Sequence, residues 1–164
     1  MNEKNHPVAH LIIGFIGAGK TTFARKLEKE TGTIRFTKDE WTVKVFGHNN
    51  LPKDKFFEYD SKMAKLATEI ALRCLTSGAS VILDDGFWYR KQRDEMRQTL
   101  KDIGAVIKFY YIDTPVDVMK TRTVKRSENP PKDSFDITGE EFDNYLKMFE
   151  PPTEDEVFEL INQE

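Results

Sequence analysis

The residues best suited to chemistry lie near the N-terminus, in the stretch Gly14-Phe-Ile-Gly-Ala-Gly-Lys20-Thr-Thr22. It matches the pattern G-x-x-x-x-G-K-[ST], in which glycines let backbone N–H groups converge on a phosphate and the next helix adds the positive end of its dipole. In such a loop the lysine ammonium lies between the β- and γ-phosphates. The stretch therefore predicts an ATP site, whose expected contacts are Gly14, Gly17, Ala18, Gly19, Lys20, Thr21 and Thr22.

Two oxygen-bearing side chains are suited to a magnesium ion bound with the nucleotide. Thr21 supplies a hydroxyl inside the loop, and Asp84 follows the apolar segment Ala79–Leu83, where a carboxylate reaches the ion directly or through a water. Asp85 is the second candidate, and Asp84 is favoured because it is nearer to the strand. The alternative is that Asp84-Asp85-Gly86 only forms a turn. We expect Mg²⁺ to be held by Thr21 and Asp84.

A further carboxylate, Asp39, follows the short strand expected over Ile34–Phe36. In a doubly wound sheet this position faces the γ-phosphate from the acceptor side, where a carboxylate accepts the proton of an attacking hydroxyl. The alternative role of Asp39 is that of a helix N-cap.

Arg122 and Arg126 are one helical turn apart and therefore share a helix face. Two guanidinium groups there would close over the triphosphate and stabilise charge on the transferred group. An ordinary solvated basic face is the alternative. The expected catalytic residues are Lys20, Asp39, Arg122 and Arg126.

The sequence signal for a phosphoryl-acceptor site is less specific than that for the phosphate loop. Trp41 and Trp88 offer aromatic surface, either for stacking on a ring or for packing against the sheet. Arg93, in the helix expected after the third strand, is a candidate for holding the acceptor or a phosphate. The expected acceptor contacts are Asp39, Trp41, Trp88 and Arg93.

Strands that alternate with helices are needed to position these residues. The expected strands are Val8–Phe15, Ile34–Phe36, Ala79–Leu83, Ala105–Ile112 and Val157–Ile161; the expected helices are Thr21–Glu30, one from Phe56 to Ser77, Arg90–Ile103, one opened by Thr114-Pro115, and one capped by Thr138 and Glu141 that ends at Phe149. Asp39–Lys53 fits either a strand or a helix. This order predicts an α/β three-layer sandwich, with a parallel sheet of about five strands and a small helical lid. The loops at the carboxyl ends of the strands should share one crevice.

The composition agrees with a single domain over residues 1–164, because the chain has 164 residues and 38% hydrophobic side chains. Its apolar run near the N-terminus is too short to span a bilayer. A lone cysteine, Cys74, excludes an internal disulfide and a four-cysteine zinc site, so a reducing cytoplasm is expected. Residues 128–164 carry 12 acidic and 2 basic side chains, a balance that disfavours long nucleic acids as partners.

The chain resembles the small P-loop kinases grouped as AAA-type ATP-binding proteins, a group similar to chloramphenicol phosphotransferases, zeta toxins, gluconate kinases and polynucleotide kinase domains. The resemblance rests on the phosphate loop, on Phe36-Thr-Lys-Asp-Glu-Trp41, on Val81–Trp88 with Arg93, and on Tyr111-Ile-Asp-Thr-Pro115 leading to Arg122 and Arg126. It implies ATP-dependent transfer of the γ-phosphoryl to an alcohol, with a base at Asp39, phosphate contacts at Arg122 and Arg126, and support of the acceptor or a phosphate by Arg93.

The expected function is thus that of a cytoplasmic kinase that uses MgATP to phosphorylate a small hydroxyl-bearing molecule. One alternative is a kinase of nucleic-acid 5′-hydroxyl ends. The other is a P-loop ATPase or nucleotide-binding switch that acts through a protein partner.

Overall fold

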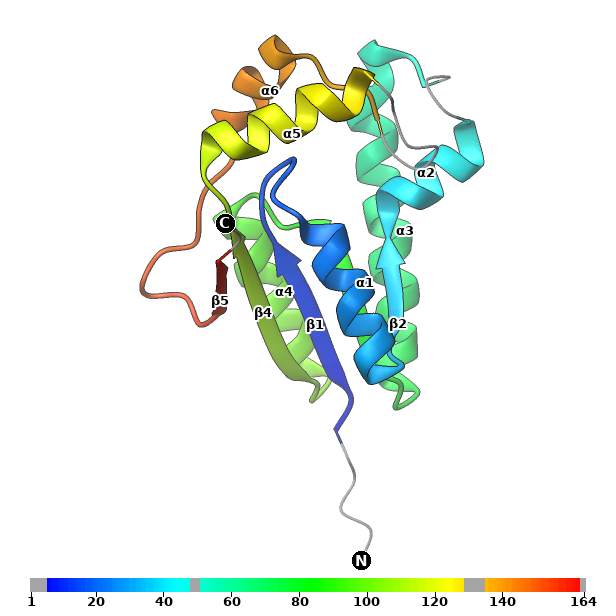
Figure 1. Ribbon diagram of the computed structural model, residues 1–164. Helices are drawn as coiled ribbons and strands as arrows, with labels where there is room; N and C mark the ends of the chain where they lie inside the picture. Colours follow the sequence, from blue (N-terminus) through cyan, green and yellow to red (C-terminus); the bar gives the residue numbers. More distant parts are fainter. Residues whose placement is uncertain (1–5, 48–50, 129–134, 163–164) are drawn as a thin grey trace, which may run out of the picture.

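The computed structural model describes residues 6–47, 51–128 and 135–162 as a parallel sheet covered by helices on both faces (Figure 1). The strands are β1 (Val8–Ile13), β2 (Ile34–Thr37), β3 (Val81–Gly86), β4 (Val106–Asp113) and β5 (Glu159–Asn162). The α-helices are α1 (Lys20–Thr31), α2 (Lys38–Phe46), α3 (Phe56–Thr76), α4 (Arg90–Asp102), α5 (Val116–Glu128) and α6 (Gly139–Leu146), with a short 3₁₀ turn at Lys53–Lys55. The predicted α/β class and five parallel strands are confirmed.

The strand order is β2-β3-β1-β4-β5, and every adjacent pair is parallel. Central strand β1 is almost fully buried, which explains its unbroken apolar sequence. Alternate β1 residues enter opposite cores: Leu11 packs with the α3 and α4 residues Ala71 and Leu100, whereas Ile12 packs with Ala24 of α1 and Phe142 of α6. Both faces of the sheet are therefore closed.

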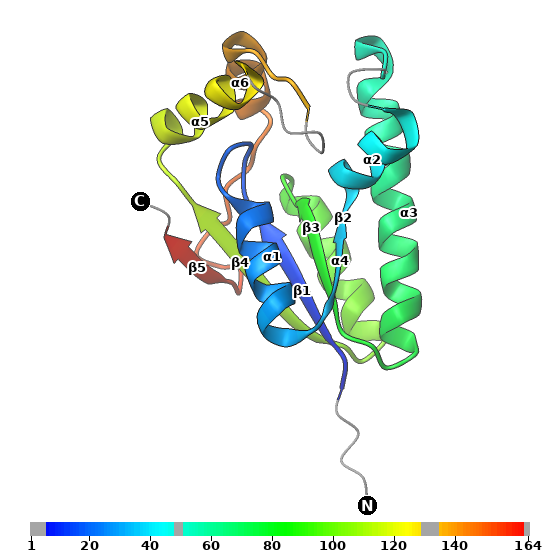
Figure 2. The ribbon, with the colours of Figure 1, turned by 45° about the vertical axis from the view of Figure 1, so that its right-hand side comes forward.

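Helices α5 and α6 lie above the carboxyl ends of the strands, opposite α2 and the first turns of α3 (Figure 2). An ion pair between Lys120 and Asp143, with 2.6 Å between Nζ and Oδ2, joins α5 to α6. The predicted capping box of α6 is present, because the Thr138 hydroxyl accepts from the Glu141 N–H and the Glu141 carboxylate accepts from the Thr138 N–H. This helix ends at Leu146, so the expected extension to Phe149 is wrong.

Several element boundaries differ from the expected ones. The helix α2 (Lys38–Phe46) begins one residue before the segment Asp39–Lys53, which fitted either a strand or a helix, and forms the first part of that segment. The last strand begins at Glu159 and not at Val157. Part of the loop expected over Ser127–Phe135 lies outside the described residues. No described helix has both the length and the apolar character needed to cross a bilayer.

The structure corrects the expected role of Arg93, which is fully buried. Its Nε and Nη2 donate to the two carboxylate oxygens of Glu156 at 2.7 and 2.8 Å, and its Nη1 donates to the carbonyls of Phe87 and Glu150 at 2.9 and 3.0 Å. An arginine can be buried this completely because each of its three guanidinium nitrogens donates to an oxygen. Arg93 thus ties the segment after α6 to α4 and does not reach an acceptor.

Replacing Arg93 by methionine should lower the free energy of unfolding by about 3–5 kcal/mol, because the Glu156 carboxylate would stay buried without its partner. Urea unfolding measures this change. Arg90→Gln is the matched control on the same helix, since Arg90 pairs with Asp155 at the surface and its loss should cost much less. An Arg93→Met protein with the urea midpoint of the unmodified protein would contradict the structural role.

Candidate nucleotide-binding and phosphoryl-transfer site

One cleft of about 1230 Å³ lies at the carboxyl ends of the strands, between the phosphate loop, the α2–α3 side and the α5–α6 lid. Its wall includes loop residues Ile16–Thr22 except Ala18, residues 37–40 after β2, Asp84 and Asp85 of β3, and Arg122 and Arg126 of α5. The residues predicted to form the site come from four distant parts of the sequence and lie together in this cleft. They do so because the carboxyl ends of parallel strands lie at one edge of the sheet.

The phosphate loop presents an uncapped helix N-terminus to this cleft. Gly19 occupies the N-cap position of α1 with no side-chain cap, and the first turn of the helix contains no acidic residue. The N–H groups of Lys20, Thr21 and Thr22 precede the first intrahelical hydrogen bond, which Phe23 makes to the Gly19 carbonyl. An anion bound here would accept from these N–H groups and meet the positive end of the helix dipole.

Position 17 requires glycine because of its backbone conformation and because of the atoms around it. Its φ is +77°, and a Cβ at this position would lie 2.5 Å from the Met119 carbonyl oxygen and 2.6 Å from the Thr123 hydroxyl, both on α5. The loop is also held to the start of the lid by Thr114, whose hydroxyl donates to the Ala18 carbonyl at 2.9 Å. The phosphate loop and the lid helix are thus packed in direct contact.

Two of the predicted loop contacts support the loop and do not line the cleft. The Gly14 N–H donates to the Gly86 carbonyl at 3.1 Å, and the Ala18 N–H donates to the Phe15 carbonyl at 3.2 Å. Their amides are therefore used within the protein. Gly17, Gly19, Lys20, Thr21 and Thr22 do line the cleft.

Lys20 lies deep in the cleft, with its Nζ 2.8 Å from the Phe15 carbonyl oxygen to which it donates. Burial lowers the pKa of Lys20, and the negative charges of Asp84 and Asp39 oppose that effect only in part. The ammonium therefore lacks full compensation of its charge within the protein. A polyphosphate at the loop would supply it.

Asp84 is buried beside the phosphate loop. Its Oδ2 accepts from the Thr21 hydroxyl at 2.8 Å and from the Thr37 hydroxyl at 3.1 Å, whereas its Oδ1 is buried with no hydrogen-bond partner among the described residues. Burial raises the pKa of Asp84, and Lys20 and the Thr21 hydroxyl oppose the rise. A carboxylate oxygen without a partner next to a hydroxyl fits the oxygen ligands that Mg²⁺ takes alongside phosphate and water.

The ladder between β1 and β3 is irregular at the two aspartates. Leu11 pairs with Leu83 but Ile13 pairs with Gly86, so β3 contains one more residue than β1 over this interval. Successive side chains of a regular strand alternate between faces, and an extra residue re-aims them. Asp84 and Asp85 consequently both line the cleft, but Asp84 contacts Thr21 whereas Asp85 accepts from the side-chain amide of Gln92 at 3.1 Å.

Asp39 lies in the first turn of α2, and Thr37 holds the N-cap position, so the N-cap alternative for Asp39 is wrong. Half of the Asp39 side chain is exposed to the cleft, and its Oδ1 is 3.2 Å from the Lys38 Nζ. Its partial burial favours the neutral acid, but the charges of Lys38 and Lys20 outweigh that effect and lower the pKa of Asp39. The group is therefore a carboxylate at neutral pH.

Sequence reasoning missed a cluster of charges on the α2–α3 side. The Lys38 ammonium lies 3.2 Å from Asp39, 2.5 Å from Asp60 of α3 and 3.6 Å from Asp85. Burial would lower the pKa of Lys38, but the three carboxylates raise it above its ordinary value. The position of Lys38 next to Asp39 was the available signal. Asp60 occupies a polar position of an amphipathic helix, which looks like any solvated position.

The two lid arginines both line the cleft. Arg126 is half-buried, its Nε has no hydrogen-bond partner among the described residues, and its charge acts on both Lys20 and Asp39. A buried donor without a partner is costly unless a ligand satisfies it. Arg126 is therefore well placed to bind an anion that enters between the lid and the phosphate loop.

Some aromatic residues near the site pack in the core, and others line the cleft. Trp41 is wrongly predicted as an acceptor contact, because it packs against the core with its ring 5.5 Å from that of Phe36 and does not line the cleft. Trp88 lines the cleft and also packs on Phe15, with ring centroids 5.0 Å apart. Neighbouring cleft walls are formed by Phe56, Phe57 and Tyr145.

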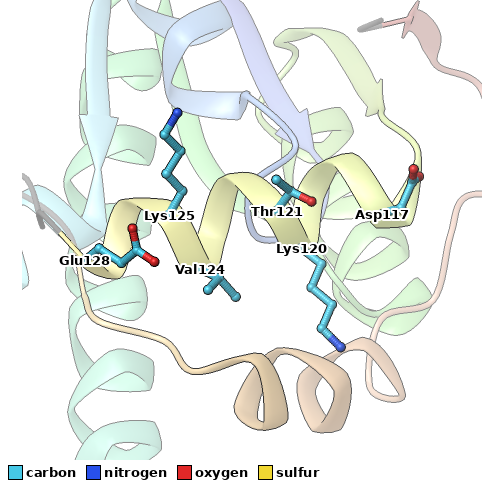
Figure 3. Close-up of a pocket in the computed structure, with 6 residues that line it drawn as sticks. All are labelled: Asp117, Lys120, Thr121, Val124, Lys125 and Glu128. Atoms are coloured by element: carbon cyan, nitrogen blue, oxygen red, sulfur yellow. The ribbon is translucent and has the colours of Figure 1, made fainter.

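A second, open hollow of about 610 Å³ runs along α5 and contains none of the predicted site residues (Figure 3). Residues of one helix alone line it, and Lys120 and Val124 point from α5 towards α6 (Figure 3). Lys120, its lining lysine nearest to α6, forms an ion pair with Asp143 of that helix. We therefore interpret this hollow as part of the outer surface of the α5–α6 lid.

Fold and cleft together define a P-loop nucleotide-binding protein of the kinase-like type. The model of a family described as an AAA domain matches residues 10–152, which is most of the chain. The chain therefore belongs to this AAA-domain family, and the resemblance to P-loop kinases noted from its motifs is confirmed.

Known proteins agree with this assignment. A shikimate kinase from Psychrobacter arcticus is 28% identical over 128 residues, which cover 73% of this chain and 61% of that enzyme, so the chain spans less than two thirds of its relative's length. A crystal structure from Chloroflexus aurantiacus superposes with a TM-score of 0.76 at 15% identity, over 96% of this chain and 89% of the other. The structure of Kti12 from Chaetomium thermophilum in complex with ADP-AlF3 superposes with a TM-score of 0.70 at 16% identity, over 94% of this chain and 88% of the other.

Asp85→Asn should make the protein more stable at neutral pH. Burial first, and then the charges of Asp60, Asp39 and Asp84, raise the pKa of Asp85, although Lys38 opposes the rise. A carboxyl with a raised pKa in the folded state destabilises the fold as the pH rises above its unfolded value. Asparagine keeps an oxygen to accept from Gln92 and removes the charge.

Thermal unfolding between pH 4 and pH 8 measures this effect. The gain in melting temperature should be largest near pH 7 and shrink towards pH 4, where Asp85 is increasingly protonated in both states. Glu95→Gln, at an exposed position of α4, is the control and should show no such pH-dependent gain. A destabilised Asp85→Asn protein at pH 7 would contradict the burial argument.

Proposed function

We propose that this protein is a kinase that transfers the γ-phosphoryl group of MgATP to a hydroxyl of a small molecule. The observation that carries the proposal is the placement of the Asp39 carboxylate in the same cleft as the uncapped N-terminus of α1 and Lys20. An ATPase needs, besides the phosphate side, only a group that positions a water molecule. A carboxylate of lowered pKa facing it from α2 is suited to accept a proton from an alcohol.

In the proposed reaction the acceptor oxygen forms a bond to the γ-phosphorus while the bond from that phosphorus to the bridging oxygen of ADP breaks. The proton of the attacking hydroxyl passes to Asp39 and then to solvent, and ADP leaves. Charge builds up on the transferred group and on the leaving oxygen, where Lys20, Arg126 and Arg122 would offset it. Most of the catalysis then comes from positioning and electrostatics, as expected for phosphoryl transfer.

The Thr21 hydroxyl and the Asp84 carboxylate would hold the magnesium ion of MgATP. When bound, the ion supplies positive charge that neutralises the β- and γ-phosphate oxygens. Asp84 contributes by placing a buried carboxylate oxygen beside Thr21, a position that β3 and the Thr37 hydroxyl hold in place.

Two comparisons support the proposal. The sequence relative is a shikimate kinase, which suggests a hydroxyl of a small molecule as the acceptor. The structural neighbour Kti12 was crystallised with ADP-AlF3, which supports a nucleotide at the phosphate loop.

Lys20→Ala should weaken ATP binding at least tenfold and abolish turnover, because the loop would lose its only long cationic side chain. Titration calorimetry with ATP and magnesium measures the affinity. Lys26→Ala, at an exposed position on the same helix, should leave both quantities unchanged. Equal affinity and turnover in Lys20→Ala and the unmodified protein would remove the nucleotide assignment.

Asp39→Asn should keep the affinity for ATP and lower kcat for phosphorylation by about 10²–10⁴, the usual contribution of a general base. ADP release in the presence of a panel of alcohols, sugars, antibiotics and nucleosides measures the rate. Glu40→Gln changes the next carboxylate along α2, which pairs with Arg25, and should have a far smaller effect on kcat.

The same assay distinguishes the two alternatives. ATP hydrolysis that no alcohol stimulates and that survives in Asp39→Asn would favour an ATPase or switch. Transfer of labelled phosphate to a 5′-hydroxyl oligonucleotide, with no small acceptor active, would favour a kinase of nucleic-acid ends.

A further inference from the structure

The charge of the cleft differs between its two ends. Near the phosphate loop, Lys20 and Arg126 are cations whose charge or donors the protein leaves incompletely matched. On the α2–α3 side, the same cleft contains Asp39, Asp60 and Asp85 around the ammonium of Lys38. When all four groups are ionised, the three carboxylates and one ammonium leave an excess of two negative charges there.

Lys38 is not available to bind an anionic group of an acceptor. Its Nζ lies 3.2 Å from Asp39, 2.5 Å from Asp60 and 3.6 Å from Asp85, so its few N–H donors already face protein carboxylates. An incoming carboxylate would have to displace one of these neighbours and leave it uncompensated in a partly buried site.

Arg93, the arginine that the sequence offered for an acceptor, and two other arginines are engaged with carboxylates of the protein. Arg93 is buried with both carboxylate oxygens of Glu156. Arg90 pairs with Asp94 and Asp155 on the outer side of α4. Arg25, which lines the cleft, lies 2.7 Å from Glu40.

Uncharged side chains also line this cleft. Trp88, Phe56 and Phe57 provide aromatic surface, and Gln92 and Ser61 provide neutral polar groups. Such walls accommodate the apolar faces and hydroxyls of a ring without requiring a charge on it.

We propose that the phosphoryl acceptor is an alcohol with no anionic group, either neutral or bearing a protonated amine, and that Asp60 and Asp85 impose this choice. The inference rests on the proposed kinase function and narrows its substrate class. Carboxylate, sulfate and phosphate groups on an acceptor are disfavoured by like charges at short range in a partly buried site. A protonated amine is favoured by the same charges.

Acceptors that differ only in charge test this proposal. Glucosamine, glucose and glucuronate share one ring, and shikimate is matched by its methyl ester. Every acceptor found active in the wider panel is compared in the same way with an acidic analogue. The quantity measured is kcat/KM for ATP-dependent phosphorylation, detected by ADP release and by ³¹P NMR of the product.

The neutral or amine-bearing member of each active set should exceed the acidic member by about tenfold or more in kcat/KM. Equal values, or preference for the acidic member, would overturn the inference while leaving the kinase function intact. If ATP binds but no member of the panel is phosphorylated, the proposed function itself fails and the inference fails with it.

Charge-removing variants locate the cause of the selectivity. Asp60→Asn and Asp85→Asn should each reduce the preference for the neutral over the acidic acceptor several-fold, through KM more than through kcat. Glu58→Gln removes a carboxylate from the exposed face of the same helix as Asp60 and should leave the preference unchanged. Thermal unfolding confirms that each variant is folded. Selectivity that is unchanged in both folded aspartate variants would also overturn the assignment.

Discussion

The structure of the site depends on a helix N-terminus that no side chain caps. Gly19 at the start of α1 offers no side-chain acceptor, and the first turn contains no carboxylate, so backbone N–H groups face the cleft without a side-chain partner among the residues that the structure describes. The buried strand β1 holds this turn from below, and α5 packs against it at Gly17, where any Cβ would collide with the Met119 carbonyl. Sheet, loop and lid are thus arranged around one place where an anion is favoured.

The two lysines of the cleft show how the fold separates two electrostatic environments. Lys20 is incompletely compensated, so burial lowers its pKa, whereas Lys38 lies among three carboxylates that raise its pKa. Between them lies Asp39, whose pKa both lysines lower. In the proposed kinase, the side at Lys20 would receive the polyphosphate and the side at Lys38 would receive the alcohol, with Asp39 next to both.

Much of the fold was predictable because its signals are local. An unbroken apolar strand, a glycine-rich turn and the capping box at Thr138 each depend on a few consecutive residues, and all are found in the structure. The end of α6 and the start of β5 were less predictable, because competing elements and not local preference decide where a short element stops. Arg93 was misassigned for a related reason: its carboxylate partner, Glu156, is 63 residues away in the sequence.

By itself, the sequence determined the α/β class, the phosphate loop and the convergence of Asp39, Asp84, Arg122 and Arg126 on one crevice, since parallel strands place their carboxyl ends at one edge. The tertiary structure alone decided which polar residues face the cleft and which face each other. Asp60 belongs to the site and Trp41 does not, because the packing of α3 and α2 on the sheet sets their directions. Distances between residues that are far apart in the sequence depend on how the helices pack on the sheet, and the spacing of residues along the chain does not specify that packing.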